Sequence, residues 1–409
     1  MLTRYDEFPI HQTPYPFAES NITDYSFDDG YFFSVFCADA DLFLMTGMRV
    51  NQNTDMIGGY AGVMFRGQQY TARFSREWRP DCDTYIGPLR YSFDRPFEDI
   101  HLTLGDNDSE LRFDIHWIGV SRAYEEEHHL AWSRGRRTTD QTRYSQSGVG
   151  LGWIEFRGQR FEVSPATGWY ASRDHSWGLY AERAPLAPAR KWLPPREVPA
   201  VRRALRFWTN FGQGQEPNSG PRFSGFYHLH ESEDGEQVRM NDTFGTPFDG
   251  GIDWGPDGRH LRLVSGSHRI EFRPGTRIME RAHLTLTDEE GGTWQQLFEP
   301  AGQPWNPHPI GYGPGSWKDG GSMYTYHGPG VQQEWDSFDW SVQPYAHTAY
   351  DGRVMPIAYG VEYLSRVTTT APDGTVSRGA AHTELFLDGR YTPYGFEASD
   401  PPSRPHSSS

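Results

Sequence analysis

The residues best able to do chemistry lie in one short stretch, GWYASRDHSWGLY, at residues 168–180, where Arg173, Asp174 and His175 follow one another between aromatic residues. An aspartate flanked by arginine and histidine can stay ionised and orient the imidazole, whereas one buried against tryptophan rings has a raised pKa and can act as a general acid. In a strand, Arg173 and His175 point to one side and Asp174 to the other, unless the chain turns here. The alternative is structural: Arg173 and Asp174 tie a β corner to neighbouring strands.

Strand patterns surround this stretch. In LRFDIHW (111–117) apolar and polar residues alternate with a period of two, as they do in AYGVEYL (358–364) and HRIEF (268–272). Helical periodicity is scarce, and only EVPAVRRALRFW (197–208) and AYEEEHHLAW (123–132) are candidates for short helices. Asp-Gly pairs, which favour tight hairpin turns, occur at 29–30, 234–235, 257–258, 373–374 and 388–389. The sequence therefore predicts an all-β, mainly antiparallel protein.

Two segments repeat. GVMFRGQQYTARF (62–74) and GWIEFRGQRFEVS (152–164) share the core Phe-Arg-Gly-Gln. Each indicates strand, Arg-Gly turn and strand, and we expect matching corners of one closed or two-layered sheet; chance similarity between hairpins is the alternative. Five prolines between 184 and 200 block regular pairing. We predict domains at 1–185 and 205–395, a Pro-rich linker at 186–204 and a disordered tail at 396–409.

Composition excludes several classes of function. The chain has 409 residues, enough for two domains, and 15% of them are aromatic. Its net charge of −16, with no basic stripe, argues against a nucleic-acid partner. Only two cysteines occur, Cys37 and Cys82, which fits a reduced, cytoplasmic chain better than a secreted disulfide framework. The N-terminal residues have no apolar core and no run approaches 18 apolar residues, so we expect neither a signal peptide nor a membrane span.

The stretch YSQSGVGLGWIEFRGQRFEVSPATGWYASRDHSWG (144–178) resembles the Asp-His-Ser-Trp-Gly region of the AttH/carotenoid 1,2-hydratase (hydroxyneurosporene synthase)-like family, in a bacterial branch of unknown function. GGYAGVMFRG (58–67), the segment 86–117 and YGPGSWKDGG (312–321) agree with it. The resemblance implies two tandem lipocalin-like antiparallel β-barrels with few short helices, an apolar ligand in or between them, and no organic cofactor. Members include hydratases of carotenoid double bonds, fungal pericyclases and lipid-binding proteins. The shared motif assigns roles to Asp174, His175 and Trp177.

The second half has its own polar cluster. His228 and His230 lie two apart, so they share one face of a strand. Metal-binding barrels present two imidazoles in this way, but further ligands would be needed, and Glu231, Glu236 and Asp242 are the local options. The spacing does not match a common metal motif and the resemblance argues against a metal. We therefore expect paired histidines that face a pocket or the surface.

Other residues could line a ligand cavity. The Gly-rich segment 306–330 is dense in aromatic residues but lacks the order of a phosphate-binding loop. It either contributes to a cavity mouth or packs over a barrel end. Together with the aromatic residues of the first motif, it gives the predicted substrate-binding set: Trp169, Tyr170, Trp177, His228, Trp317, Asp319 and Tyr324.

We predict a cofactor-independent lyase, hydratase or isomerase that acts on a hydrophobic terpenoid, steroid-like or aromatic molecule. Asp174 would protonate an alkene or help expel a small fragment, His175 or His230 would move the second proton, and Arg173 would assist. Aromatic faces would stabilise developing positive charge. The alternative is a carrier that binds a hydrophobic ligand unchanged, with the charged motif as a structural latch; carbohydrate recognition is a third hypothesis. A homodimer is compatible with the sequence.

Overall fold

The computed structural model describes residues 2–9, 11–19, 22–79, 82–133, 135–180, 203–216, 220–239, 247–342, 346–356 and 361–397. Within these ranges every regular element is a strand or a short 3-10 helix, which confirms the all-β class. No described helix is long and apolar enough to cross a membrane. The 3-10 helices are η1 (Arg4–Glu7), η2 (Gln52–Thr54), η3 (Pro165–Thr167), η4 (His308–Ile310) and η5 (Thr392–Tyr394).

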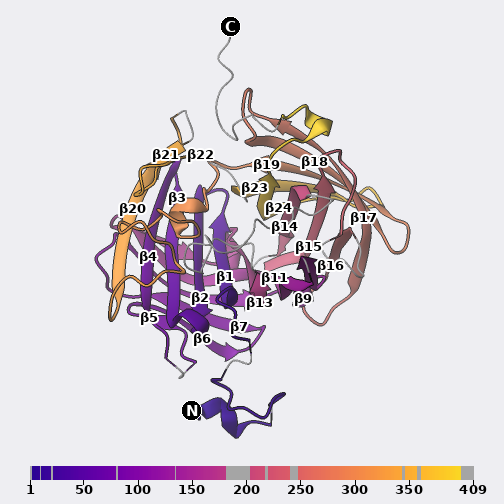
Figure 1. The fold of residues 1–409 in the computed structure, drawn as a ribbon. Helices are drawn as coiled ribbons and strands as arrows, with labels where there is room; N and C mark the ends of the chain where they lie inside the picture. Colours follow the sequence, from indigo (N-terminus) through magenta and orange to yellow (C-terminus); the bar gives the residue numbers. More distant parts are fainter. Residues whose placement is uncertain are drawn as a thin grey trace.

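The first half of the chain builds a large antiparallel sheet (Figure 1). Its strands are β1 (Phe27–Cys37), β2 (Leu42–Asn51), β3 (Met56–Phe65), β4 (Gln68–Glu77), β5 (Tyr85–Ile86), β6 (Leu89–Arg95), β7 (Asp99–Leu104), β8 (Leu111–Gly119), β9 (Tyr124–Glu125), β10 (His129–Ser133), β11 (Arg136–Phe156), β12 (Gln159–Val163), β13 (Tyr170–Tyr180) and β20 (Gln332–Asp339). The order is β20-β4-β3-β2-β1-β13-β11-β8-β7-β6-β5, and β9, β10 and β12 also pair with β11. Over the described residues this path has two ends, so hydrogen bonding does not close it into a barrel.

The second half forms a closed eight-stranded barrel, the lipocalin-like element that the resemblance implied. Its strands follow one another in the order β14 (Arg203–Glu216), β15 (Gly220–Ser232), β16 (Phe248–Asp253), β17 (His260–Phe272), β18 (Met279–Asp288), β19 (Thr293–Pro300), β23 (Val361–Thr370) and β24 (Val376–Leu387). A two-stranded sheet of β21 (Ala346–Thr348) and β22 (Val354–Pro356) lies outside both.

Strand β20 comes from the second half of the chain but pairs with β4 in the first sheet. The connection from the barrel therefore crosses over the sheet, and the buried side chain of Trp305 donates a hydrogen bond to the Phe43 carbonyl on the way. The predicted linker, 186–204, lies outside the described residues except for its last two, and the predicted tail lies outside them from residue 398. The division of the chain at that linker thus stays a prediction.

Both helix predictions are wrong in the described residues. Segment 123–132 contains β9 and β10, and the described part of 197–208 begins β14. In β14, Leu205 and Phe207 pack in the barrel core while Arg206 and Trp208 face the other way. Pairing with β15 and β24 satisfies the backbone on both sides, so tertiary contacts override a weak helical pattern.

The turn predictions are confirmed with one exception. Both repeated hairpins form, and Arg66-Gly67 and Arg157-Gly158 take positive φ values as a tight two-residue turn requires. Of the other four Asp-Gly pairs named above, 234–235, 257–258 and 373–374 lie in turns and Gly389 lies in a bend, but Asp29-Gly30 lies inside β1. Glycine is required there for a different reason, because a Cβ at Gly30 would come within 2.5 Å of the Arg49 guanidinium.

Replacing Gly158 by alanine should lower the free energy of unfolding by about 1 to 2 kcal/mol, because φ is 73° and no neighbour would contact the new Cβ, so the effect is backbone strain alone. Urea unfolding measures it. Gly105→Ala is the matched control: it has no positive φ and only one distant neighbour, and it should be nearly neutral. Equal effects of the two substitutions would contradict the strain argument.

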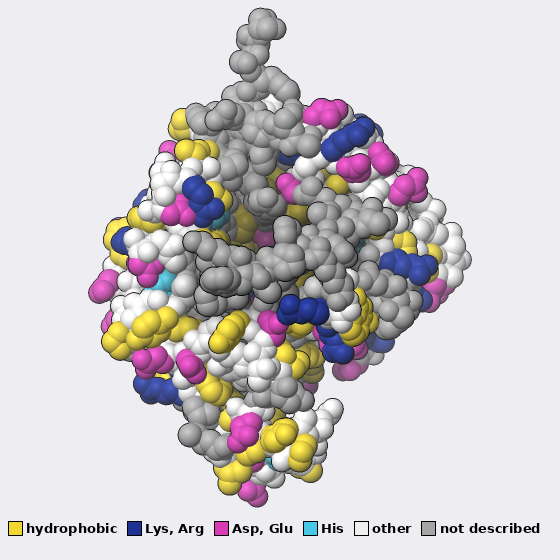
Figure 2. Space-filling model, viewed as in Figure 1, with side chains coloured by type: hydrophobic (Ala, Val, Ile, Leu, Met, Phe, Trp, Pro, Cys, Tyr) yellow, Lys and Arg dark blue, Asp and Glu magenta, His cyan; other side chains and the backbone are white. Residues whose placement is uncertain are grey.

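Acidic and basic side chains are interspersed on the described part of the face in Figure 2, and basic ones do not gather into a stripe there.

Candidate functional site

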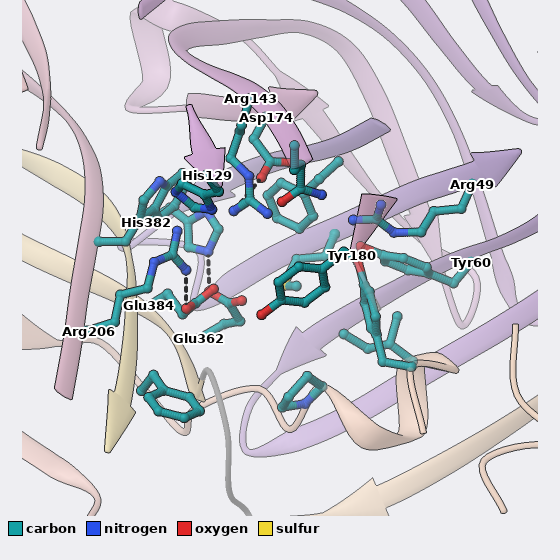
Figure 3. Close-up of a pocket in the computed structure, with 18 of the residues that line it drawn as sticks. Arg49, Tyr60, His129, Arg143, Asp174, Tyr180, Arg206, Glu362, His382 and Glu384 are labelled. Carbon is teal, nitrogen blue, oxygen red and sulfur yellow. Dashed lines mark hydrogen bonds and ion pairs between the residues drawn. The ribbon is translucent and has the colours of Figure 1, made fainter. Parts of the chain in front are cut away.

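A cavity of about 330 Å³ lies where the outer wall of the barrel faces the first sheet (Figure 3). The barrel strands explain its position, because successive side chains point to opposite faces. On β24, Leu385 packs into the barrel core, whereas His382 and Glu384 line the cavity. Rings and apolar side chains complete the wall: Phe32, Met45, Tyr60, Tyr180, Trp208, Ile310, Tyr312 and Phe386.

Two glutamates and a histidine form the acid–base group of this cavity. Glu362 on β23 and Glu384 on β24 are directly opposite in the strand register. Burial, and then the neighbouring carboxylate of Glu384, raise the pKa of Glu362 well above its ordinary value. Glu384 is in turn paired with Arg206. The arrangement keeps one carboxyl protonated and holds the other as an ion pair.

His382 connects this group to the first sheet. Its Nε2 is 2.7 Å from Glu362 Oε2, and its Nδ1 is 2.9 Å from Ser172 Oγ, which contacts Ser34 Oγ at 2.7 Å. Burial and the positive charge of Arg206 lower the pKa of His382 to about 3. The imidazole is therefore neutral at pH 7, and it can exchange a proton with Glu362 while a hydroxyl fixes its other nitrogen.

Asp174 faces the same cavity from β13. Its Oδ2 lies 3.4 Å from Arg143 Nη1, while Oδ1 is buried and has no hydrogen-bond partner among the described residues. Asp174 is opposite Phe32 on β1, which also lines the cavity. A carboxylate held by one ion pair, with a lone pair aimed into a ring-lined space, can accept a proton from a bound molecule or from water.

A second buried polar layer lies behind the cavity. Glu126 accepts hydrogen bonds from Ser145 Oγ at 2.6 Å and Trp208 Nε1 at 3.3 Å, and its Oε2 is 3.4 Å from His228 Nδ1. Burial opposes its ionisation, but His228 and the positive charge of Arg143 outweigh burial and lower the pKa of Glu126. Burial lowers the pKa of His230 well below its usual range, and neither ring nitrogen has a hydrogen-bond partner among the described residues.

The structure separates the members of the sequence motif. Because β13 continues through the motif as a strand, Asp174 faces the cavity while Arg173 and His175 face the other side. His175 Nε2 is 2.6 Å from Asp29 Oδ1, its ring stacks on Tyr31, and Asp29 and Tyr31 line a different cavity of about 600 Å³. Placing His175 beside Asp174 at one reaction centre is therefore not supported by the geometry.

The buried Arg173 donates hydrogen bonds to Gln146 and Tyr144 and packs against aromatic rings. Burial lowers its pKa. These contacts match the structural strut that the sequence left open as an alternative, and they place Arg173 away from the cavity lined by Asp174.

The predicted substrate-binding residues are also dispersed. None of them is among the residues that line the cavity. Trp169 and Tyr170 are buried in two different cores, and Trp177 contacts His175 on the far face of β13. Trp317 stacks on His327, to which Asp319 is bound, and Tyr324 is buried in the same loop. His228 and His230 lie in the polar layer, their rings 4.8 Å apart.

Sequence reasoning missed most of the cavity: Arg49, Tyr60, His129, Gln141, Arg143, Tyr180, Arg206, Glu362, His382 and Glu384. The sequence did contain a pattern that indicates three of these residues. Glu362 lies within the alternating stretch 358–364, and His382 and Glu384 are spaced by two in GAAHTELF (379–386). Charged residues at alternate positions of an otherwise apolar strand mark a face that must be covered by another part of the protein.

Among the described residues, no group of three or more His, Cys, Asp or Glu side chains is arranged to hold a metal ion. The His228/His230 pair has Glu126 beside it, but Glu231, one of the suggested ligands, is instead bound to Tyr391 and His268. Another suggested ligand, Asp242, lies outside the described residues.

Comparison with known proteins adds a family and a set of similar structures. The model of a family described as "Family of unknown function (DUF8625)" matches residues 2–349. No curated protein matches. Among solved structures, kievitone hydratase from Nectria haematococca is 10% identical with a TM-score of 0.46, covering 95% of this chain and 96% of that one. CghA with Sch210972 is 8% identical with a TM-score of 0.45, covering 88% of each chain.

Proposed function

The chain belongs to this family of unknown function (DUF8625), and we propose from its site that it is a cofactor-independent hydratase or lyase acting on a hydrophobic small molecule. The observation that carries the proposal is Glu362, a buried carboxylic acid with a raised pKa, hydrogen-bonded to His382 in a ring-lined cavity that also contains Asp174. Concerted acid–base chemistry requires one protonated acid and one deprotonated base in the same site.

Glu362 is the proposed general acid. In hydration, its proton forms a C–H bond with one carbon of an alkene, using the π electrons of the double bond. Positive charge then develops on the other carbon, where the faces of Tyr180 and Trp208 can stabilise it. Neutral His382 orients the Glu362 carboxyl through their 2.7 Å contact. Glu362 regains its proton through water from Asp174, the group that is protonated later in the cycle.

Asp174 is the proposed base. A water oxygen forms the new C–O bond, and the free Oδ1 of Asp174 accepts the proton that this water loses. Elimination of water runs through the same steps in reverse, so a single site supports a hydratase and a dehydratase. Arg143 holds the carboxylate in place through its contact with Oδ2.

The test uses solvent isotopes, because the substrate is not identified. We expect the protein, incubated in H₂¹⁸O and D₂O with terpenoids, steroids and phenylpropanoid dimers, to return at least one compound with solvent oxygen or deuterium incorporated. Asp174→Asn should lower that incorporation by about 10²-fold or more, the usual effect of losing a catalytic base. Mass spectrometry measures it.

Asp29→Asn is the matched control, because Asp29 binds His175 on the other side of the sheet. It should keep most of the activity. Incorporation that is unchanged in Asp174→Asn would overturn the assignment of the base. A ligand that binds in the cavity and is always recovered unaltered would favour the alternative, a carrier for a hydrophobic molecule.

A further inference from the structure

We propose that Arg49 and Tyr60 form an anion subsite at the end of the cavity away from Glu362, so that the ligand is an amphipathic organic anion. Such a ligand has an apolar ring system or chain and one acidic group, such as a carboxylate. The inference concerns the same cavity as the proposed function and rests on it for the reaction. Figure 3 shows Arg49 and Tyr60 at one side of this space and Glu362, His382 and Arg206 at the other.

The strand register builds this subsite. On β2, Gly47 is opposite Tyr60 of β3, and Arg49 is opposite Gly58, so Arg49 and Tyr60 are diagonal neighbours on one face. The Tyr60 ring lies over Gly47, where a Cβ would come within 2.6 Å of it. Gly30 on β1 leaves the space that the Arg49 guanidinium occupies. Gly47 and Gly30 therefore allow two large polar side chains, Tyr60 and Arg49, to reach the cavity from a crowded sheet.

Both side chains carry polar atoms with unused hydrogen-bonding capacity. Arg49 is 4% exposed and Tyr60 is 1% exposed, and both line the cavity. Arg49 Nη1 donates to Asp28 Oδ2 at 3.1 Å, and Arg49 Nε has no hydrogen-bond partner among the described residues. The Tyr60 hydroxyl interacts with the neighbouring Tyr312. A buried donor without an acceptor is energetically unfavourable. A ligand oxygen that accepts from both groups would remove that penalty.

The charge of the cavity also favours an anion. Acidic residues outnumber basic ones in the whole chain, 54 to 38. In the cavity the order is reversed, because four arginines and three carboxylic acids line it. The acids are Asp174, paired with Arg143, Glu384, paired with Arg206, and Glu362, which contacts neutral His382. Basic side chains therefore outnumber acidic ones along the wall of the cavity.

The test is a matched pair of fluorescent probes. 8-Anilinonaphthalene-1-sulfonate and N-phenyl-1-naphthylamine share the same ring system and differ by one sulfonate. We expect the intact protein to bind the sulfonate at least 10-fold more tightly than the neutral amine. Tyr60→Phe, which deletes only the hydroxyl, and Arg49→Met should each reduce this preference several-fold. Circular dichroism checks that the variants fold.

Arg366→Met is the control, because Arg366 is exposed and bound to Asp39 outside the cavity. It should leave the preference unchanged. The anion subsite is refuted if the amine binds as tightly as the sulfonate, if neither probe binds, or if folded Tyr60→Phe keeps the full preference. In each of these cases isotope incorporation from solvent can still occur, so the proposed function is judged separately.

Discussion

Replacing Glu362 by glutamine should lower isotope incorporation by about 10²- to 10⁴-fold, the range expected when a general acid is removed. Glutamine preserves the size of the side chain and can still contact His382, but it carries no acidic proton. The barrel should remain folded, because the Glu362 backbone, which pairs with Trp305 and β24, is unchanged. Turnover of the first compound found in the isotope screen measures the effect.

The pH dependence gives an independent check on Glu362. Its pKa is raised, by burial first and by Glu384 second, so the acid form persists above the usual range of a glutamic acid. Activity that needs this proton should fall as the pH rises through the raised pKa, and Glu362→Gln should lack that limb. The exposed Glu299→Gln is the control and should keep the wild-type profile. If Glu362→Gln still loses activity at high pH as the wild type does, that loss must come from another group.

The local folding rules were readable from the sequence because they depend on few residues. Phe-Arg-Gly-Gln forms the same turn twice since only the Arg-Gly pair must accept positive φ. The failures arise where a distant contact decides. Position 30 in β1 requires glycine because the side chain of Arg49 occupies the space beside it. Strand β20 pairs with β4, about 260 residues away in sequence. Neither partner can be identified from a local pattern.

The site was only partly predictable for the same reason. Asp174 was found because an aspartate among aromatic residues is unusual, and alternation correctly raised the separation of Asp174 from His175. Glu362, His382 and Glu384 were missed because each appears as an ordinary polar position of a strand exposed to water. They become chemically unusual only when the first sheet covers the outer wall of the barrel, and that packing joins residues about 200 positions apart.

Lowering the pH should destabilise the fold strongly, because several buried groups bind a proton less readily in the folded protein than in the unfolded chain. The pKa of His382 is lowered to about 3 by burial and Arg206, against 6.5 in the unfolded chain. Its stabilising contribution is complete above pH 6.5 and is lost as the pH falls towards 3. Each pH unit in this window is worth about 1.4 kcal/mol, so His382 alone should account for roughly 3 kcal/mol between pH 7 and 4.

Other groups modify this slope in known directions. Burial lowers the pKa of His129 and His230, so their contributions to the free energy of unfolding also decrease as the pH falls. The lowered pKa of Glu126 acts in the same direction. Glu362 acts oppositely: its raised pKa adds stability in acid that is lost as the pH rises. Because the three histidines act in one direction over this range and Glu362 in the other, we expect a net loss of stability between pH 7 and pH 4.

Urea unfolding at pH 7, 5.5 and 4 measures this loss. His382→Gln should be less stable than the wild type at pH 7, because it loses the bonds to Ser172 and Glu362, yet it should lose less on acidification. His283→Gln is the control, because His283 is only partly buried, and it should show the wild-type slope. Parallel pH profiles for wild type and His382→Gln would mean that His382 accepts a proton in the folded protein as readily as in the unfolded chain. That result would contradict the lowered pKa of His382 on which this prediction depends.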